Sequence, residues 1–143
     1  GCNDFVEAHM ISSLQKVDNP NRAWWRQKCA EFGYFKPSYP GTSVFFNNLP
    51  VEHIVSYCDA FFGITPEQVV SNMGRTNSIY GGKSLSGSNI IFTNGLLDPW
   101  HLLSITEDEG DVKAVTYEAG HCAPLIQSTD IDPPSLVQAR QVV

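Results

Sequence analysis

The stretch Ile90-Ile91-Phe92-Thr93-Asn94-Gly95-Leu96-Leu97-Asp98-Pro99-Trp100 is a short apolar run that ends in a turn and an ionisable residue. A second stretch of the same design is Ala114-Val115-Thr116-Tyr117-Glu118-Ala119-Gly120-His121-Cys122. Short apolar runs of this kind are typical of strands buried on both faces of a parallel sheet. Each run places one ionisable residue just beyond the carboxyl end of its strand, the edge where an open α/β sheet binds ligands. The two stretches predict an α/β fold with Asp98 and His121 as candidate site residues.

The order of these two residues, acid first and histidine second, matches the second half of an α/β-hydrolase, whose nucleophilic serine comes earlier in the chain. In a Ser-His-Asp triad, the acid accepts a hydrogen bond from one ring nitrogen of the histidine, and the other nitrogen takes the serine proton. No G-x-S-x-G motif precedes Asp98. The alternative is structural: Asp98 caps a turn ahead of Pro99, and His121 is a core or turn histidine. The residues alone leave both interpretations open.

Composition bounds the class of protein. The chain has 143 residues, 42% of them hydrophobic, which is enough for an ordinary globular core. Its net charge is -6, and its nine Lys and Arg residues are scattered, so a nucleic-acid partner is not expected. No run approaches the roughly 18 apolar residues of a membrane span. The first residues, Gly1 to Asp4, do not form a signal peptide, so secretion would require a signal upstream of residue 1.

Apolar spacing and turn signals predict the remaining elements. We expect helices over 3–16 and 50–62, the second closed by Gly63, a short helix from Pro66, and a terminal helix over 133–143 that packs on the sheet. The aromatic-rich stretch 24–35 is predicted as a buried strand.

The four cysteines, at positions 2, 29, 58 and 122, have neither a C-x-x-C pair nor histidines at zinc-finger spacing. Disulfides, and with them an oxidising compartment, are favoured over four buried thiols in a reducing one. The acidic turn 107–111 lacks the spacing of a calcium loop. No metal and no cofactor are therefore expected.

Four motifs resemble those of the prolylcarboxypeptidase, dipeptidyl-peptidase II and thymus-specific serine protease family. Residues 92–100 resemble its N-G-x-x-D-P-W segment, and residues 118–123 match its E-x-A-H-C-A around the histidine. Residues 25–35 resemble W-x-Y-Q-x-C-T-E-F-G-Y-F, and residues 74–82 resemble N-R-T-N-x-x-Y-G-G. The motifs are co-linear, and the resemblance runs from about Cys2 to the C-terminus.

This resemblance implies an α/β-hydrolase domain that is interrupted by a helical insertion. Residues 1–143 would be the C-terminal segment of that single domain and would start at the end of the insertion. Asp98 would be the triad acid and His121 the triad base. Trp100 would wall the substrate pocket, although a core aromatic is an equally good interpretation. Such enzymes are secreted or lysosomal exopeptidases that cut next to proline or, in the dipeptidyl-peptidase branch, small residues.

The resemblance also assigns the cysteines. Cys29 and Cys58 match a pair that is bridged in relatives, and Cys2 resembles a cysteine bridged to a partner that lies outside this sequence. Cys122 has no assigned partner. Because neighbouring side chains of an extended backbone face opposite ways, Cys122 and His121 are not expected to form a Cys-His nucleophilic dyad.

The leading hypothesis is a serine-type exopeptidase acting on peptides, in which this chain supplies the Asp and His of the triad. It would be active only with an N-terminal chain or segment of the same precursor that bears the serine. Alone it would be inert and prone to aggregate through its unpaired strand edges; homo-oligomerisation is left open. The alternative is a catalytically silent family member with a structural or binding role in an extracellular assembly. The upstream sequence, with or without G-x-S-x-G, discriminates between the two.

Overall fold

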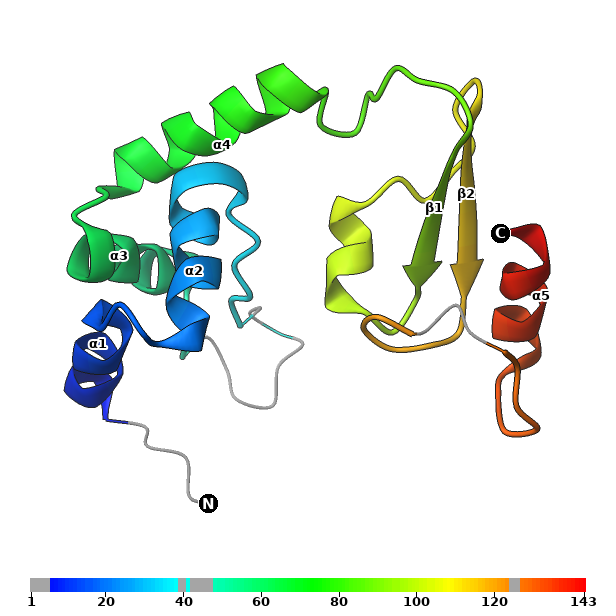
Figure 1. Ribbon diagram of the computed structural model, residues 1–143. Helices are drawn as coiled ribbons and strands as arrows, with labels where there is room; N and C mark the ends of the chain where they lie inside the picture. Colours follow the sequence, from blue (N-terminus) through cyan, green and yellow to red (C-terminus); the bar gives the residue numbers. More distant parts are fainter. Residues whose placement is uncertain (1–5, 39–40, 42–47, 124–126) are drawn as a thin grey trace. The chain divides into compact units, whose positions relative to one another are not determined.

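The computed structural model describes residues 6–38, 41, 48–123 and 127–143 (Figure 1). The chain divides into two compact units, Gly1–Tyr80 and Gly81–Val143, and each is treated by itself below. The assignment of residues 1–143 to one segment of a single α/β-hydrolase domain stays a prediction. Cys2, with its expected bridge to another segment, lies outside the described residues.

The first unit is helical in its described residues (Figure 1). Its elements are α1 (Glu7–Gln15), α2 (Pro20–Gln27), the π-helix η1 (Lys28–Phe32), α3 (Val51–Phe62) and α4 (Pro66–Tyr80). α3 ends at Gly63, whose φ of +64° is the left-handed conformation that closes many helices. Within the described residues, the predicted helices over 3–16 and 50–62 are confirmed, whereas α4 is longer than the short helix expected from Pro66.

The predicted strand over residues 24–35 is wrong, because α2 and η1 occupy most of this stretch. α2 begins at Pro20, and the Asn19 side chain caps it by accepting a hydrogen bond from the Asn21 N–H at 2.8 Å. Within α2, Trp25 packs edge-on against Phe61 of α3, with ring centroids 5.1 Å apart. The helix start signal therefore outweighs the strand preference of the aromatic residues.

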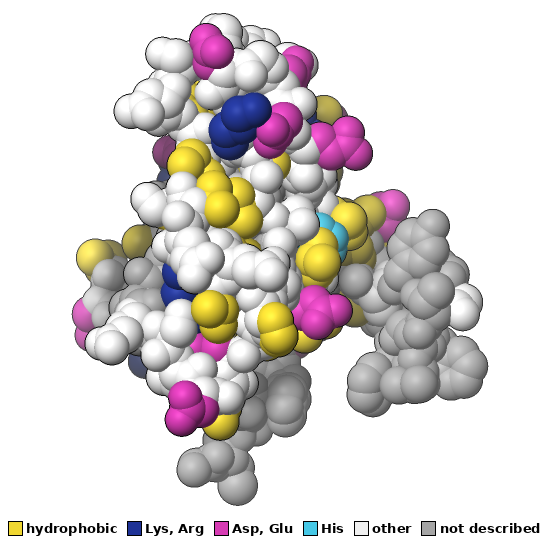
Figure 2. Space-filling model, turned by 90° about the vertical axis from the view of Figure 1, so that its right-hand side faces the viewer, with side chains coloured by type: hydrophobic (Ala, Val, Ile, Leu, Met, Phe, Trp, Pro, Cys, Tyr) yellow, Lys and Arg dark blue, Asp and Glu magenta, His cyan; other side chains and the backbone are white. Residues whose placement is uncertain are grey.

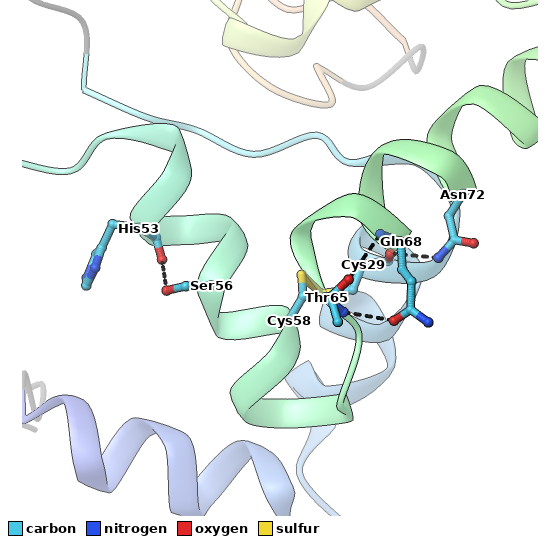
Figure 3. Close-up of a disulfide and its surroundings, with 7 residues drawn as sticks. All are labelled: Cys29, His53, Ser56, Cys58, Thr65, Gln68 and Asn72. Carbon is cyan, nitrogen blue, oxygen red and sulfur yellow. Dashed lines mark hydrogen bonds between the residues drawn. A yellow bond between two sulfur atoms is a disulfide. The ribbon is translucent and has the colours of Figure 1, made fainter.

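A disulfide between Cys29 and Cys58 lies at the centre of the first unit (Figure 3). This is the pair that the family resemblance implied. Both cysteines are fully buried against Val69 of α4, and the Asn72 side chain donates a hydrogen bond to the Cys29 carbonyl at 3.3 Å. Because the bond joins residues 29 positions apart, we expect it to stabilise the fold by about 3–4 kcal/mol. It fixes η1 to α3.

Lys28, next to this disulfide, carries a buried ammonium group. Its side chain is only 8% exposed, and Nζ lies 4.2 Å from the ring centroid of Trp25 and 4.8 Å from that of Phe35. Burial, with a smaller contribution from the charge of Lys36, lowers the pKa of Lys28 from 10.5 to about 8. The ring faces favour the charged form and so offset part of the cost of burial.

We predict that Lys28→Met stabilises the first unit at neutral pH by about 1–2 kcal/mol, because methionine keeps the packing without a buried charge. The folded-state pKa lies below the unfolded-state value, so the charged lysine opposes folding below pH 8. The wild-type free energy of unfolding should therefore rise between pH 8 and about 10.5 relative to that of the variant. Urea unfolding across this range measures the difference, with exposed Lys16→Met as the control. Parallel curves for wild type and Lys28→Met would contradict the prediction.

The second unit is built on two parallel strands, β1 (Ile90–Gly95) and β2 (Val112–Tyr117). They pair in register from Ile90 with Val112 to Gly95 with Tyr117. The 3-10 helix η2 (Pro99–Leu103) follows β1, and α5 (Pro134–Val142) lies beside β2 (Figure 1). The core of the unit joins Tyr117 to two buried residues of α5, Leu136 and Ala139. Both predicted strands, the terminal helix and the α/β class are confirmed.

Burial of the strands differs from the expectation. Ile91 in β1 is 39% exposed, and Phe92 is half-buried. The described residues form a sheet of only two strands, so in this part of the chain no second strand pairs with the outer edge of β1. Apolar side chains of β1 are therefore more exposed than the sequence predicts for a strand buried on both faces.

The described residues show neither a basic patch on the face in view (Figure 2), nor a membrane-spanning helix, nor a group of metal ligands. On the face shown in Figure 2, dark-blue Lys and Arg side chains are separated by white and yellow ones and form no patch. Within the described residues, no helix combines the length and apolarity needed to cross a bilayer. In the same part of the chain, His, Cys, Asp and Glu side chains do not gather in groups of three that could hold a metal ion.

Candidate active site

The turn after β1 positions Asp98. At the end of the strand, the buried Asn94 donates a hydrogen bond from Nδ2 to the Ile105 carbonyl at 2.8 Å and ties the strand to the segment beyond η2. The chain then turns, with the Asp98 N–H donating to the Gly95 carbonyl at 2.9 Å. Asp98 caps η2, because its Oδ1 accepts a hydrogen bond from the Trp100 N–H at 2.9 Å. The capping role that the structural interpretation gave to Asp98 is therefore present.

The segment after β2 is fastened to this turn by backbone hydrogen bonds. The Leu96 N–H donates to the Tyr117 carbonyl at 2.8 Å, and the Leu97 N–H donates to the Ala119 carbonyl at 3.0 Å. Because the strands are parallel and in register, the two strand ends lie at the same edge of the sheet. The backbone thus holds the segment that carries Asp98 against the segment that carries His121.

Gly95 permits this close approach. A Cβ atom at this position would lie 2.6 Å from the Ala119 carbonyl oxygen and 2.8 Å from that of Gly120. Both atoms belong to the backbone immediately before His121 and cannot swing aside as a flexible side chain would. The glycine of the N-G-x-x-D-P-W segment is therefore required by the packing of the two loops.

We predict that Gly95→Ala destabilises the second unit by about 1–3 kcal/mol, as overpacking typically does, and displaces His121. Any activity that depends on His121 as the predicted base should fall about 10- to 100-fold, since small shifts of a general base are costly. Gly120→Ala is the matched control, because a Cβ placed there meets no atom of the described residues within 4 Å apart from those of its chain neighbours. Thermal unfolding and rate measurements on both variants test the prediction. Equal rates for both would show that the close approach at Gly95 does not position His121.

The structure brings Asp98, His121 and Trp100 together. Nδ1 of His121 lies 2.7 Å from Oδ2 of Asp98, and the Trp100 indole meets the imidazole edge-to-face, with ring centroids 4.7 Å apart and planes at 82°. The side chain of Asp98 is 16% exposed and that of His121 is 51% exposed. A carboxylate can only accept hydrogen bonds, so Nδ1 carries the proton and Nε2 is the basic nitrogen. This arrangement can accept a proton from a hydroxyl group placed at Nε2.

Cys122 departs from the expectation. Its backbone has a φ of +53°, so it is not extended, and its side chain does not face away from His121. Sγ lies 3.3 Å from Nε2 of His121, and the thiol is exposed and not in a disulfide. The reason given against a Cys-His contact is therefore wrong: the left-handed backbone turns both side chains to the same side. Only the glycine before His121 hinted that this segment is irregular.

One further polar residue of the site was missed by sequence reasoning. His101, in η2, is hydrogen-bonded through Nδ1 to the Asp98 carbonyl oxygen. It lies three residues after the acid, where a 3-10 turn returns its side chain to the backbone at the start of the helix. The Pro99 at the first position of η2 was the available signal for this turn.

Comparisons with known proteins show which family this chain belongs to. The family model described as serine carboxypeptidase S28 matches residues 2–143. The thymus-specific serine protease of Mus musculus is 32% identical over 150 residues, covering 99% of this chain and 29% of that protein. A putative serine protease of Caenorhabditis elegans is 31% identical and covers 99% of this chain and 30% of that protein. Lysosomal Pro-X carboxypeptidase of Homo sapiens is 41% identical over 68 residues, covering 46% of this chain and 14% of that protein.

These matches define a class of hydrolytic enzymes, the serine peptidases. The chain belongs to the serine carboxypeptidase S28 family, so the family resemblance found in the sequence is confirmed. It spans about 30% of the length of the curated relatives that it matches over almost its whole length. No solved structure matches it significantly.

Proposed function

We propose that this chain supplies the acid and the base of a Ser-His-Asp triad in a serine peptidase. The single observation that carries the proposal is the 2.7 Å hydrogen bond between Oδ2 of Asp98 and Nδ1 of His121 at the ends of two parallel strands. The imidazole is half-exposed, and the Cys122 thiol, whose Sγ lies 3.3 Å from Nε2, would give way to a hydroxyl group from another segment. The serine and the oxyanion donors would come from the part of the protein that precedes these residues in the family.

In this mechanism, Nε2 of His121 removes the serine proton as the serine oxygen attacks the scissile carbonyl carbon. The imidazolium then donates that proton to the leaving amine as the peptide C–N bond breaks. Asp98 keeps the proton of Nδ1 in place throughout and stabilises the positive charge on the ring. In the second half of the reaction, Nε2 removes a proton from water as the water oxygen attacks the acyl carbon. The imidazolium then returns that proton to the serine oxygen as the ester bond breaks, which releases the carboxylic acid product and the free serine.

The exposed apolar side chains around the site support the proposal that a second part of the same protein packs there. Leu97 is 73% and Leu102 is 68% exposed, although both flank the turn that holds Asp98. Ile91 is also exposed on β1, and apolar side chains of this size gain from being covered. We infer that preceding strands of an α/β-hydrolase sheet pair with β1 and that a helical insertion lies upstream. The expected bridge from Cys2 would tether this chain to that part.

The proposed substrates are peptides, cut as an exopeptidase cuts them. The human relative is named a lysosomal Pro-X carboxypeptidase, which favours cleavage next to proline here as well. The buried Cys29–Cys58 disulfide supports an oxidising compartment, so we propose a secreted or lysosomal location. Trp100, beside His121, would form part of the wall of the substrate pocket.

Labelling of the native protein with a fluorophosphonate tests the proposed activity. We expect the label on a serine outside residues 1–143, on a polypeptide that includes this chain or is joined to it by a disulfide that a reducing gel separates. The catalytically silent alternative predicts that the folded, intact protein takes up no label.

The Cys122→Ala variant tests which residue is the nucleophile, because Sγ lies close to Nε2. We predict that this variant keeps at least half of the wild-type labelling rate and peptidase activity, since alanine leaves the Asp98–His121 pair in place. Loss of activity in this variant, with label found on Cys122 in the wild type, would replace the serine mechanism by a cysteine one.

A further inference from the structure

Two contacts can hold the imidazole of His121 while Nε2 receives a serine hydroxyl group. One is the hydrogen bond from Nδ1 to Oδ2 of Asp98 at 2.7 Å, and the other is the edge-to-face contact with the Trp100 indole at 4.7 Å. A third contact, from Sγ of Cys122 to Nε2 at 3.3 Å, must give way to the serine hydroxyl group, and the His121 side chain is half-exposed. Each of the first two contacts restrains a motion that the other leaves free.

A single hydrogen bond fixes the direction of Nδ1 but not the plane of the ring. The imidazole can still rotate about the line from Nδ1 to the carboxylate oxygen, and this rotation sweeps Nε2 through an arc. Rate depends steeply on the position of a general base relative to the hydroxyl group that it deprotonates. A half-exposed histidine held by the carboxylate alone would therefore spend part of its time with Nε2 misdirected.

Trp100 is itself fixed by the residue that binds the histidine. Oδ1 of Asp98 accepts the Trp100 N–H at 2.9 Å, while Oδ2 of the same carboxylate accepts the proton of His121 Nδ1. Pro99 occupies the first position of η2 and restricts the backbone between the two residues. Acid, tryptophan and histidine thus form a closed ring of contacts, and a planar side chain at position 100 faces the imidazole.

We propose that Trp100 is a positioning residue that sets the plane of the His121 imidazole and so directs Nε2 at the serine. This inference rests on the proposed function, because it requires His121 to act as the base. It differs from a role of Trp100 in the substrate pocket. Orientation of the base affects the rate of the chemical step with any acylating reagent, whereas a pocket wall affects the binding of the substrate.

The test uses the native protein and diisopropyl fluorophosphate, a small reagent that reacts with activated serines whatever the peptide specificity. For Trp100→Leu, which keeps apolar bulk but lacks a ring, we expect kinact to fall about five- to tenfold while KI stays within about twofold. Trp100→Phe, which restores a planar ring, should recover kinact to within about twofold of the wild type. Trp100→Met serves as a second non-aromatic variant, and thermal unfolding identifies the variants that fold.

Unchanged kinact in a folded Trp100→Leu or Trp100→Met variant overturns the inference. A raised KI with unchanged kinact also overturns it and assigns Trp100 to the substrate pocket. The His121→Ala variant distinguishes failure of the inference on Trp100 from failure of the proposed function. If this variant reacts as fast as the wild type, the proposed function itself fails. If His121→Ala is unreactive while the Trp100 variants react normally, only the inference on Trp100 fails.

A measurement on the folded wild-type protein covers the case in which no non-aromatic variant folds. The indole ring current should shift the proton signals of the His121 imidazole, which are identified by their absence from the His121→Ala spectrum. Trp100→Phe should reduce that shift. Unshifted signals in the wild type would show that the two rings are not in contact in solution and would overturn the inference.

Discussion

Replacing His121 by alanine is expected to lower kcat/KM of the native peptidase on the order of 10⁴- to 10⁶-fold, the range found when a triad histidine is removed. In the proposed mechanism Nε2 takes the serine proton, while the other ring nitrogen, Nδ1, is hydrogen-bonded to Asp98. Without the imidazole, the serine hydroxyl must lose its proton to water. The fold should survive, because the side chain of His121 is half-exposed and lies outside the buried core of the second unit.

The measurement is a pair of assays, hydrolysis of a Pro-X peptide and fluorophosphonate labelling, on folded wild-type and variant protein. His53→Ala is the matched control, since this exposed histidine lies in the other unit, where its Nε2 is hydrogen-bonded to the hydroxyl group of Tyr57. The control should keep the wild-type rates. A His121→Ala variant that keeps a tenth of the activity would remove this residue from the mechanism.

The strands and the candidate acid and base could be predicted because local and global preferences agree there. Short runs rich in apolar residues define the six-residue strands β1 and β2, and parallel pairing places the residues that follow them at one edge of the sheet. The family motifs around Asp98 and His121 favour the catalytic interpretation over the structural one, and that role stays a prediction. The proximity of Asp98 and His121 thus followed from the order of the two strands in the chain and from the geometry of parallel sheets.

The helix over residues 20–27 could not be recognised from aromatic content, because its tryptophans suit a strand as well as a helix face. The Asn19-Pro20 cap was the deciding signal, and it lies outside the aromatic stretch. The contact of Cys122 with His121 depends on one left-handed residue, a local choice that no spacing rule specifies. Neither could the sequence reveal that Trp100 meets the imidazole, since this contact joins residues from two different loops.

The structure gives a physical reason for most positions of the N-G-x-x-D-P-W segment. Asn94 fastens the strand end to Ile105, and Gly95 leaves space for the backbone that precedes His121. Asp98 binds the histidine and caps η2, which Pro99 starts. The two unspecified positions are leucines with exposed side chains, which act here through their backbone N–H groups. The segment therefore works as one unit that presents a carboxylate to the imidazole.

Replacing Asp98 by asparagine should lower kcat on the order of 10⁴-fold through the tautomer of the histidine. The Trp100 N–H, a donor, requires an oxygen at the position of Oδ1, so the amide must place its NH2 group toward His121. Nδ1 would then have to accept a hydrogen bond, which moves the ring proton to Nε2. A protonated Nε2 cannot take the proton of the serine.

This variant separates the effect of Asp98 on His121 from its role as the cap of η2. Asparagine is as good a helix cap as aspartate and keeps the hydrogen bond to Trp100. Its melting temperature should match that of the wild type, whereas Asp98→Ala, which removes the cap as well, should also lose about 1 kcal/mol of stability. Stopped-flow and steady-state rates on the two variants, with ¹⁵N NMR of the imidazole, give both readouts. If Asp98→Asn retained a proton on Nδ1 and most of its activity, Asp98 would be only the cap of η2. The acid would then have to come from the part of the protein that brings the serine.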